Sequence, residues 1–465
     1  MFDKTDPSIF EGEWTFEKTE RAVLGLCKIL DHYAHKLTLD DLKNDPRCAK
    51  IPDLSLERVQ EVIADVEAKL WRGVKPIDNE VIYHTGPHHD DIMLGIMPFI
   101  MRQLRSPHNQ VHFAIMTSGF HSVTDEFLLE ALFDTLSLLR RGLIQMVNYP
   151  DFFEQGYRFK QEKDIHHYLD NVARKNPNGM RRGFCHRILR DAVGLWHLKS
   201  VAELEQRLEI EIETLQKGLP NSPEIQKLKG EVREFEEELV WAYAGTALDH
   251  IHHLRLGLYN DSSSGVISSS GVIAGEDPQS PKAWSPNRQR DVEPILTQLR
   301  AIHPTVITVA MDSVGLAPKT HYKVMQTIAE AVRLWNEEED LSKLRIFGYR
   351  NVWSTYHPAE ANVYVPVSLN TMAVFEKAFK DSYLTQVKAE FPNPDFDGPF
   401  CELAEQIWAK QYKDIQLILG KDFFYENAHP LVRATHGLLF LKEMTVKEFI
   451  TFAEEMKGKV KLENK

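Results

Sequence analysis

The sequence predicts an α/β fold: a doubly wound, mostly parallel sheet with a helical insertion and helical N- and C-terminal extensions. Three observations support this prediction. From about residue 79, short apolar runs alternate with amphipathic helical patterns, as in folds with a parallel sheet. Between about residues 155 and 230 the apolar spacing becomes helical throughout. Helical patterns also dominate both ends of the chain.

Residues 1–78 are predicted to form the helical N-terminal extension, because RAVLGLCKILDHYAHKL and SLERVQEVIADVEAKLW repeat apolar residues at helical spacing. Residues 79–375 are predicted to form the α/β domain. Its strands are expected at 81–84, 111–119, 250–259, 305–312 and 344–353. Helical patterns such as QRDVEPILTQLRAI separate several of these runs, which predicts parallel pairing.

The insertion at about 155–230 is predicted to be a helical hairpin. Ser222 followed by Pro223 is a typical helix start, with a capping hydroxyl and a first-turn proline. One apolar stripe is formed by Leu204, Leu208, Ile210, Ile212 and Leu215. Such a stripe needs a partner surface. We expect a subunit interface in a homo-oligomer, and packing on the chain itself or a lid over a pocket are the alternatives.

Residues 376–465 are predicted to form a helical C-terminal extension, in which Thr445 and Glu448 make a capping box. The Ser-, Gly- and Pro-rich stretch 261–286 is predicted to be a long loop.

Composition excludes several classes of protein. The chain has 465 residues, 43% hydrophobic and 26% charged, which is typical of globular proteins. Its net charge of -13 argues against a nucleic-acid partner. The longest apolar run is about half the ~20 residues of a membrane span, so no span is expected. Four scattered cysteines without a CxxC pair, and no apolar signal core, predict a reduced, cytoplasmic protein.

The stretch VIYHTGPHHDDIMLG, residues 81–95, places four polar side chains at the carboxyl end of the first expected strand. Ligands bind at this edge of open α/β sheets. One interpretation is that Asp90 and Asp91 are acids at a helix start, stabilised by the helix dipole. The other is a metal site, in which His88 and Asp91 converge on one ion and Asp90 acts as a base on its water.

A third ligand is expected from a neighbouring strand end. The strand TVITVAMD is followed by DSVGLAPKTHYK, which places His321 at the start of the next helix. With His88 and Asp91 this completes two imidazoles and one carboxylate. Such a set favours one Zn²⁺ per chain, with a position left for water.

These motifs resemble those of the PIG-L/LmbE zinc deacetylases, whose first motif is His-Pro-Asp-Asp-Glu and whose later motif ends in a histidine. The resemblance implies an LmbE-like fold, His88, Asp91 and His321 as zinc ligands, and Asp90 as general base. Arg233-x-x-Glu236 is similar to a further motif of the family.

The stretches 347–370 and 419–444 resemble the deacetylase-like half of bacterial two-part proteins described as glucosamine-6-phosphate deaminases. That resemblance implies a phosphorylated or nucleotide-linked N-acetylglucosamine as substrate. The chain lacks the isomerase domain of those proteins, which argues against sugar-phosphate isomerisation or deamination.

The chain departs from the family pattern at three positions: His89 replaces the proline, Ile92 the glutamate, and Pro318 a histidine that assists catalysis. Another group must replace that histidine. The candidates are His84 and His357 as catalytic residues and His121 at the substrate. Arg350 and Lys319 are further candidates for substrate binding, since either cation suits a phosphate or a carboxylate.

The sequence therefore predicts a zinc-dependent amidohydrolase that acts on a small-molecule amino sugar and releases acetate. The alternative is a non-catalytic sugar-binding or regulatory protein that retains the deacetylase fold. The Pro318 departure favours this alternative.

Overall fold

The computed structural model describes residues 7–154, 161–258, 285–313, 315–389 and 396–462. Within these ranges, seven strands form one mixed sheet in the order β3-β2-β1-β4-β5-β7-β6. Their bounds are β1 Val81–Gly86, β2 Gln110–Ile115, β3 Ile251–His253, β4 Val306–Ala310, β5 Arg345–Tyr349, β6 Val363–Ser368 and β7 Thr435–Met444. Strands β1 to β5 pair in parallel, and β7 is antiparallel to both of its neighbours. The expected α/β class with a mostly parallel sheet is confirmed.

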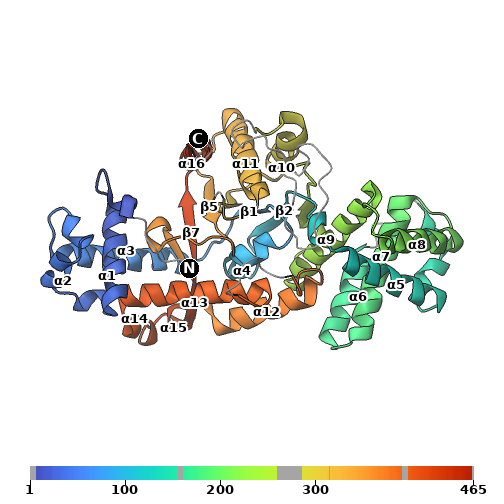
Figure 1. The fold of residues 1–465 in the computed structure, drawn as a ribbon, viewed down its shortest axis with the longest axis horizontal. Coiled ribbons are helices and arrows are strands. Elements are labelled where there is room, and N and C mark those ends of the chain that lie inside the picture. The colour runs from blue at the N-terminus through green and yellow to red at the C-terminus, as the bar shows by residue number, and fades with distance from the viewer. Residues whose placement is uncertain (1–6, 155–160, 259–284, 314, 390–395, 463–465) are drawn as a thin grey trace.

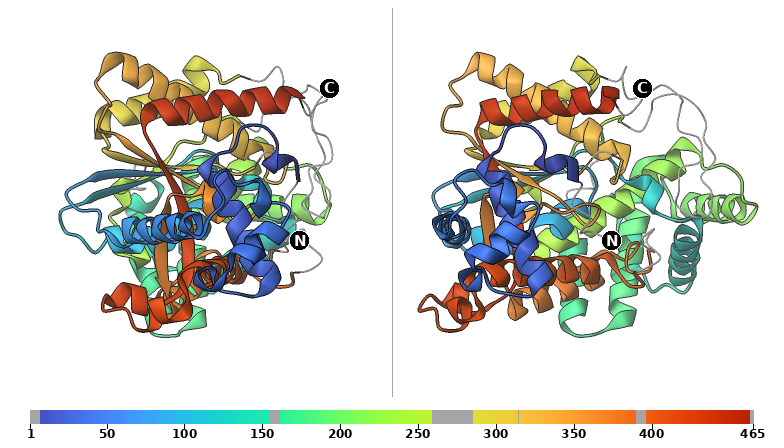
Figure 2. Two further views of the ribbon diagram at one scale, coloured as in Figure 1. Left: turned by 90° about the vertical axis from the view of Figure 1, so that its left-hand side faces the viewer. Right: turned by 60° about the vertical axis from the view of Figure 1, so that its left-hand side comes forward.

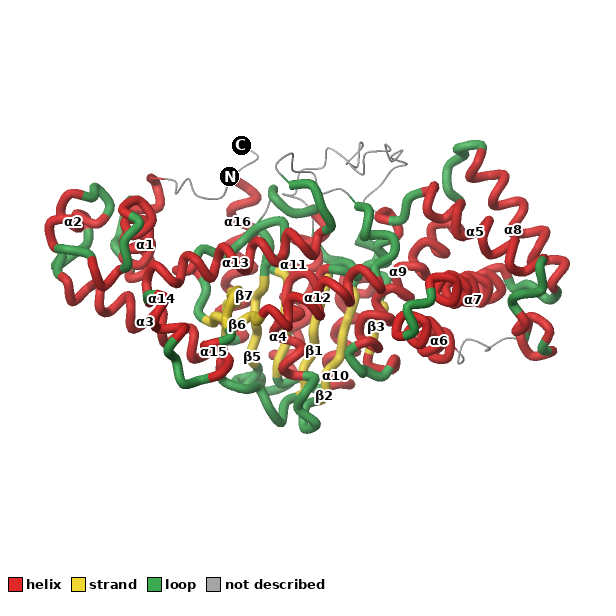
Figure 3. Tube along the Cα trace, turned by 90° about the horizontal axis from the view of Figure 1, so that it is seen from below, coloured by secondary structure: helices red, strands yellow, loops and turns green. Residues whose placement is uncertain are grey.

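Helices cover both faces of this sheet (Figure 1). The α-helices of the described residues, including those that do not cover the sheet, are α1 Phe16–Leu30, α2 Leu39–Asn44, α3 Leu56–Val74, α4 Asp91–Gln103, α5 Asp125–Arg140, α6 Gln161–Ala173, α7 Pro177–Trp196, α8 Val201–Gln216, α9 Pro223–Tyr243, α10 Glu293–Ile302, α11 Lys319–Glu338, α12 Leu369–Ser382, α13 Phe400–Leu419, α14 Lys421–Tyr425, α15 Pro430–Arg433 and α16 Val446–Leu462. Helices α4, α12 and α13 cover one face, as Figure 3 shows from below. Helices α10, α11 and α16 cover the other, and Figure 2 shows α16 along that face. No helix in the described part of the chain is long and apolar enough to span a membrane.

The central strands are apolar on both sides because each side meets a helical layer. In β1, Ile82 packs into the core under α4, whereas its neighbour Tyr83 packs into the core under α10 and α11. Successive side chains of a strand point to opposite faces, so a strand covered on both faces has no polar alternation. The short continuous apolar runs of the sequence have this cause.

The order of the strands reverses between β1 and β4. From β1 the sheet is built outward through β2 to β3, and the chain then returns to β4 and builds outward through β5. At such a switch point the loops after the two strands leave in opposite directions and open a crevice at their carboxyl ends. His88 and Asp91 follow β1, and His321 follows β4, so the topology brings the two motifs to this crevice.

The prediction of a helical extension over 376–465 is wrong for residues 435–444. They form β7, which lies between β5 and β6 inside the sheet. The flanking helices α13 and α16 pack on opposite faces of the sheet. The C-terminal region is therefore part of the α/β domain rather than an addition to it.

The insertion is larger than a hairpin. Helices α6 to α9 pack with α5 around a separate hydrophobic core, at the right-hand side of Figure 1. Leu204, Leu208, Ile212 and Leu215 are buried in that core, whereas Ile210 is 47% exposed. The stripe that suggested a subunit interface is thus covered within the chain itself, so the expectation of an interface loses its basis.

At the opposite side of the sheet, α1 and α3 pack against β6 and α13 around a third core. The four cysteines are free thiols, and all are buried. Of the predicted loop 261–286, residues 261–284 lie outside the described residues.

Candidate metal centre

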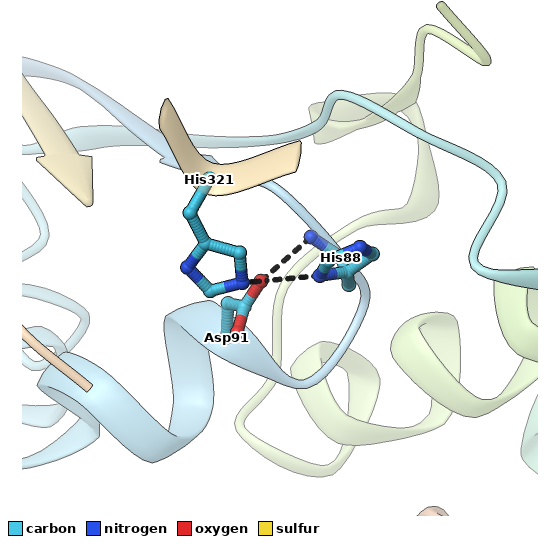
Figure 4. A group of neighbouring side chains, drawn as sticks. All are labelled: His88, Asp91 and His321. Carbon is cyan, nitrogen blue, oxygen red and sulfur yellow. Dashed lines mark hydrogen bonds and ion pairs between the residues drawn. The ribbon is translucent and has the colours of Figure 1, made fainter. Parts of the chain in front are cut away.

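The turn after β1 forms the first half of the site. Gly86 ends the strand, and a Cβ there would lie 2.6 Å from Ile92 Cγ1, so the turn requires glycine. The backbone N–H of His88 donates to Asp91 Oδ2 at 2.8 Å, and His88 Nδ1 lies 3.0 Å from the same oxygen. These contacts close the turn and point the Asp91 carboxylate back towards His88, as Figure 4 shows.

The second half comes from β4 and α11. His321 is the third residue of α11, and its Nδ1 lies 2.9 Å from Asp312 Oδ2, just beyond β4. The other oxygen of Asp312 accepts from the backbone N–H of Asn351 at 3.1 Å and from Ser354 Oγ at 3.3 Å. Asp312 is thereby fixed, and it fixes the ring of His321 with Nε2 facing the turn after β1.

His88, Asp91 and His321 converge as predicted. One ligand atom from each lies within 4.8 Å of the other two, and His321 Nε2 is 3.4 Å from Asp91 Oδ2. Asp91 and His321 are buried, and His88 is partly exposed at the edge of the site. His321 Nε2 is buried and makes no hydrogen bond within the described residues. A buried imidazole nitrogen that makes no hydrogen bond and lies beside a buried carboxylate suits the binding of a divalent cation.

The charges of the group also favour a bound cation. Burial alone would raise the pKa of Asp91, but the charge of His321 and the hydrogen bond from His88 lower it to about 2. Burial would lower the pKa of His321, but Asp91 and Asp312 raise it to about 9. Two carboxylates thus hold a positive charge on the buried ring, and a metal ion supplies such a charge in place of the proton.

Asp90 is the N-cap residue of α4, but its carboxylate contacts another helix. Although it precedes α4, its side chain makes no capping hydrogen bond to the helix. Its Oδ1 instead accepts from Arg233 Nη2 of α9 at 3.0 Å. Arg233 is itself held by Glu236 Oε2 at 2.7 Å. Asp90 and Asp91 do lie at the start of α4, as the helix-start interpretation expects, and Asp90 in addition pairs with a buried arginine.

His84 and His357, the two histidines suggested as catalytic, lie elsewhere, and this corrects the prediction. His84 is fully buried between Thr308 Oγ1 at 3.0 Å and Gln103 Oε1 at 2.9 Å, and burial lowers its pKa to about 3. His357 caps the 3-10 turn Pro358–Glu360, where Nδ1 accepts from the backbone N–H of Ala359 at 3.1 Å. Both rings have structural partners and do not reach the metal group.

The three candidates for substrate binding lie in different surroundings. Arg350 is a structural residue: it donates to Met311 O at 3.2 Å and Thr355 O at 2.9 Å, and it pairs with Glu360. Lys319 is exposed at the first residue of α11, two positions before His321.

His121 lies in the 3-10 turn after β2. Its pKa is lowered to about 4, by burial first and then by the charges of His88 and Lys229. Of the three histidines proposed to replace the family residue, His121 is the one whose pKa is lowered by the charge of His88, a member of the metal group.

An open cavity of about 220 Å³ lies between α9 and the turn after β2. Its lining residues are Ser118, Phe120, Gln226, Lys227, Gly230, Glu234 and Arg255. Two of these residues, Gly230 and Glu234, belong to α9, the helix whose Arg233 contacts Asp90.

Sequence reasoning missed the residues that orient the ligands. Asp312 holds His321, and Asn351 Nδ2 donates to Asp91 Oδ1. Their position after β4 and β5 was the available signal, since carboxyl strand ends collect site residues. No protein-family model, no curated protein and no solved structure matches this chain.

Proposed function

We propose that the chain is a zinc-dependent amidohydrolase with an LmbE-like fold, which removes the acetyl group from an N-acetylglucosamine derivative. The observation that carries the proposal is the convergence of His88, Asp91 and His321 at the switch point of the sheet. Two imidazoles and one carboxylate, with a position left for water, are a ligand set of catalytic zinc sites. Asp90, adjacent in sequence to Asp91, supports a hydrolytic role.

A zinc ion held by these residues would act as a Lewis acid on the amide carbonyl and lower the pKa of water from ~15.7 towards ~7. Asp90 takes the proton of the attacking water through Oδ2, because Arg233 holds Oδ1. Asp90 then returns the proton to the nitrogen as the C–N bond breaks, which yields acetate and the free amine. His121 is the side chain proposed to donate to the developing oxyanion.

The cavity between α9 and the turn after β2 suggests the substrate class. Lys227, Arg255 and Glu234 line it, and because Arg255 pairs with Glu234 through both Nε and Nη2, the net positive charge of the lining comes from Lys227. A net positive lining suits a phosphorylated or nucleotide-linked amino sugar, whose acetamido group would extend towards Asp90.

A second candidate function is that of a non-catalytic sugar-binding protein with the same fold. Pro318 favours it, because a proline immediately before α11 supplies no proton where the resembling family has a histidine. The two candidates differ in turnover and agree in metal binding and sugar binding.

The decisive experiment measures zinc content and acetate release together. Protein purified without chelator is expected to hold about one zinc per chain and to release acetate from one member of a panel of N-acetylated sugar phosphates and nucleotide sugars. His88→Ala and His321→Ala should lose both zinc and activity. Lys323→Ala, a partly buried residue of the same helix, serves as the control.

Stoichiometric zinc in both histidine variants would show that the metal assignment is wrong. Zinc binding with sugar binding, but without acetate release from any panel member, would favour the non-catalytic alternative.

A further inference from the structure

Residues 383–386, which follow α12, contact the candidate site although they lie about 290 residues beyond its first motif in the chain. Tyr383 is fully buried, and its hydroxyl is 2.6 Å from the backbone carbonyl of His89. The same hydroxyl also forms a short hydrogen bond with the carboxyl group of Glu237 on α9. The carbonyl it contacts belongs to the residue between the ligand His88 and the base Asp90.

The direction of these two hydrogen bonds follows from counting protons. The hydroxyl of Tyr383 has one proton, and the carbonyl of His89 can only accept. The bond to Glu237 therefore takes its proton from Glu237, which is buried and whose other oxygen accepts from Trp241 Nε1 at 2.6 Å. Burial raises the pKa of Glu237 to about 8, against the hydrogen bonds of Tyr383 and Trp241. The carboxyl group is thus protonated at neutral pH, and a chain of donors runs from Glu237 through Tyr383 to His89.

Thr385 and Gln386 contact the other parts of the site. Thr385 donates to Glu236 from its backbone N–H at 2.6 Å and from Oγ1 at 2.8 Å, and it accepts from Arg233 Nη1 at 3.1 Å. Gln386 Nε2 donates to Ser122 O at 3.3 Å, in the turn that carries His121. One short segment therefore contacts the turn after β1, the turn after β2, and the residue pair that holds Asp90.

We propose that residues 383–386 position the metal-binding turn, and that the hydroxyl of Tyr383 is the group that sets the affinity of the site for zinc. The inference rests on the proposed zinc site. Partners that orient metal ligands typically change metal affinity ~10–100-fold when removed. Loss of the hydroxyl frees the His89 carbonyl and leaves the Glu237 proton without an acceptor, so the turn between His88 and Asp91 relaxes.

The chain provides a matched control in Tyr364 of β6. Tyr364 is also fully buried, and its hydroxyl also contacts a backbone carbonyl, Pro358 O at 2.8 Å, and a glutamate, Glu20 Oε1 at 3.3 Å. Strands β4, β5 and β7 separate β6 from β1, so this hydroxyl is remote from the site. Tyr364→Phe removes the same chemistry without touching the metal-binding turn.

The experiment measures the zinc dissociation constant of the full chain by competition with a chelator. Tyr383→Phe is expected to weaken zinc binding about 10-fold, and Tyr364→Phe to leave it at the wild-type value. Glu237→Leu should weaken binding more than Glu237→Gln, because the amide of glutamine can still donate to Tyr383. If Tyr383→Phe does not fold, Thr385→Val against Thr385→Ser tests the same segment, with serine expected to restore affinity.

Equal affinity in wild type and Tyr383→Phe overturns the inference, and so does an equal loss in Tyr364→Phe. A wild-type chain that binds no zinc overturns the proposed metal site itself. The two failures are therefore distinguishable.

Discussion

The carboxylate of Asp312 lies 2.9 Å from Nδ1 of His321, and this contact decides which nitrogen of the ring faces the metal group. A carboxylate at Nδ1 keeps a proton on that nitrogen, so Nε2 is left as the ligand atom. Asp312 is itself held by the backbone N–H of Asn351 and by Ser354, so its carboxylate is a fixed acceptor for the ring.

Replacement of Asp312 by asparagine is expected to weaken zinc binding ~10–100-fold while the fold is kept, because the amide neither fixes the tautomer nor raises the basicity of the ring. Competition with a chelator measures the change. Asp291→Asn is the control, since the side chain of Asp291 is as buried as that of Asp312 but pairs with Arg290 near α10. An unchanged affinity in Asp312→Asn would show that His321 is oriented by other contacts.

Asp90→Asn is expected to keep zinc and lose most amide hydrolysis. An amide cannot accept the proton of water, and loss of a general base typically costs ~10²–10⁴-fold in rate. The zinc content of the variant is the internal control, because Asp90 is not among the three convergent ligands. Turnover close to wild type in zinc-loaded Asp90→Asn would falsify the assigned role.

Parts of the sheet and site that depend on local sequence could be predicted, and parts that depend on long-range contact could not. The apolar runs at β1, β2, β4 and β5 could be recognised as strands because helices cover both faces of this part of the sheet. Strand β6 contains Pro366, which argues against a central strand, and it is tolerated because β6 is at the edge of the sheet. Strand β7 was missed because the leucine-rich run THGLLFLKEM suits a helix as well as a strand.

The same distinction holds for the side chains of the site. His88, Asp91 and His321 could be predicted because parallel strands deliver their following residues to one edge. Among 20 histidines, nothing local separates His121 from His84, since only the folded chain shows which ring is sealed between Thr308 and Gln103. Tyr383 gave no signal at all, because its partner His89 is 294 residues away.

The separate core of α5 to α9 makes a stability prediction with an internal control on one helix. Leu204 of α8 is fully buried, whereas Ile210 of the same helix is 47% exposed. Leu204→Ala is expected to lower the free energy of unfolding by ~2–5 kcal/mol, through lost burial and the cavity left behind. Ile210→Ala should change it by less than about 0.5 kcal/mol. Urea unfolding followed by circular dichroism measures both, and equal losses would contradict the observed packing of α8.

The buried ring of His84 makes a prediction about pH. Its pKa is lowered to about 3 by burial, from an ordinary value of 6.5. Between these two values the unfolded chain binds a proton at this site and the folded chain does not. Acid therefore favours unfolding. The contribution of the neutral His84 ring to the free energy of unfolding is fully present above the pKa of histidine in the unfolded chain, and it is lost progressively as the pH falls below that value.

The corresponding slope is about 1.4 kcal/mol of unfolding free energy per pH unit from this one ring. His84→Gln removes the titration and keeps a side chain that can bond to Thr308 and Gln103. We therefore expect the variant to lose less stability than wild type between about pH 6.5 and pH 4.5, whatever its stability at neutral pH. Urea titrations of both proteins across this range measure the difference, and parallel pH profiles would show that His84 is not held neutral in the fold. Zinc content should be unaffected by His84→Gln, because the ring bonds to Thr308 and Gln103 and not to any member of the metal group.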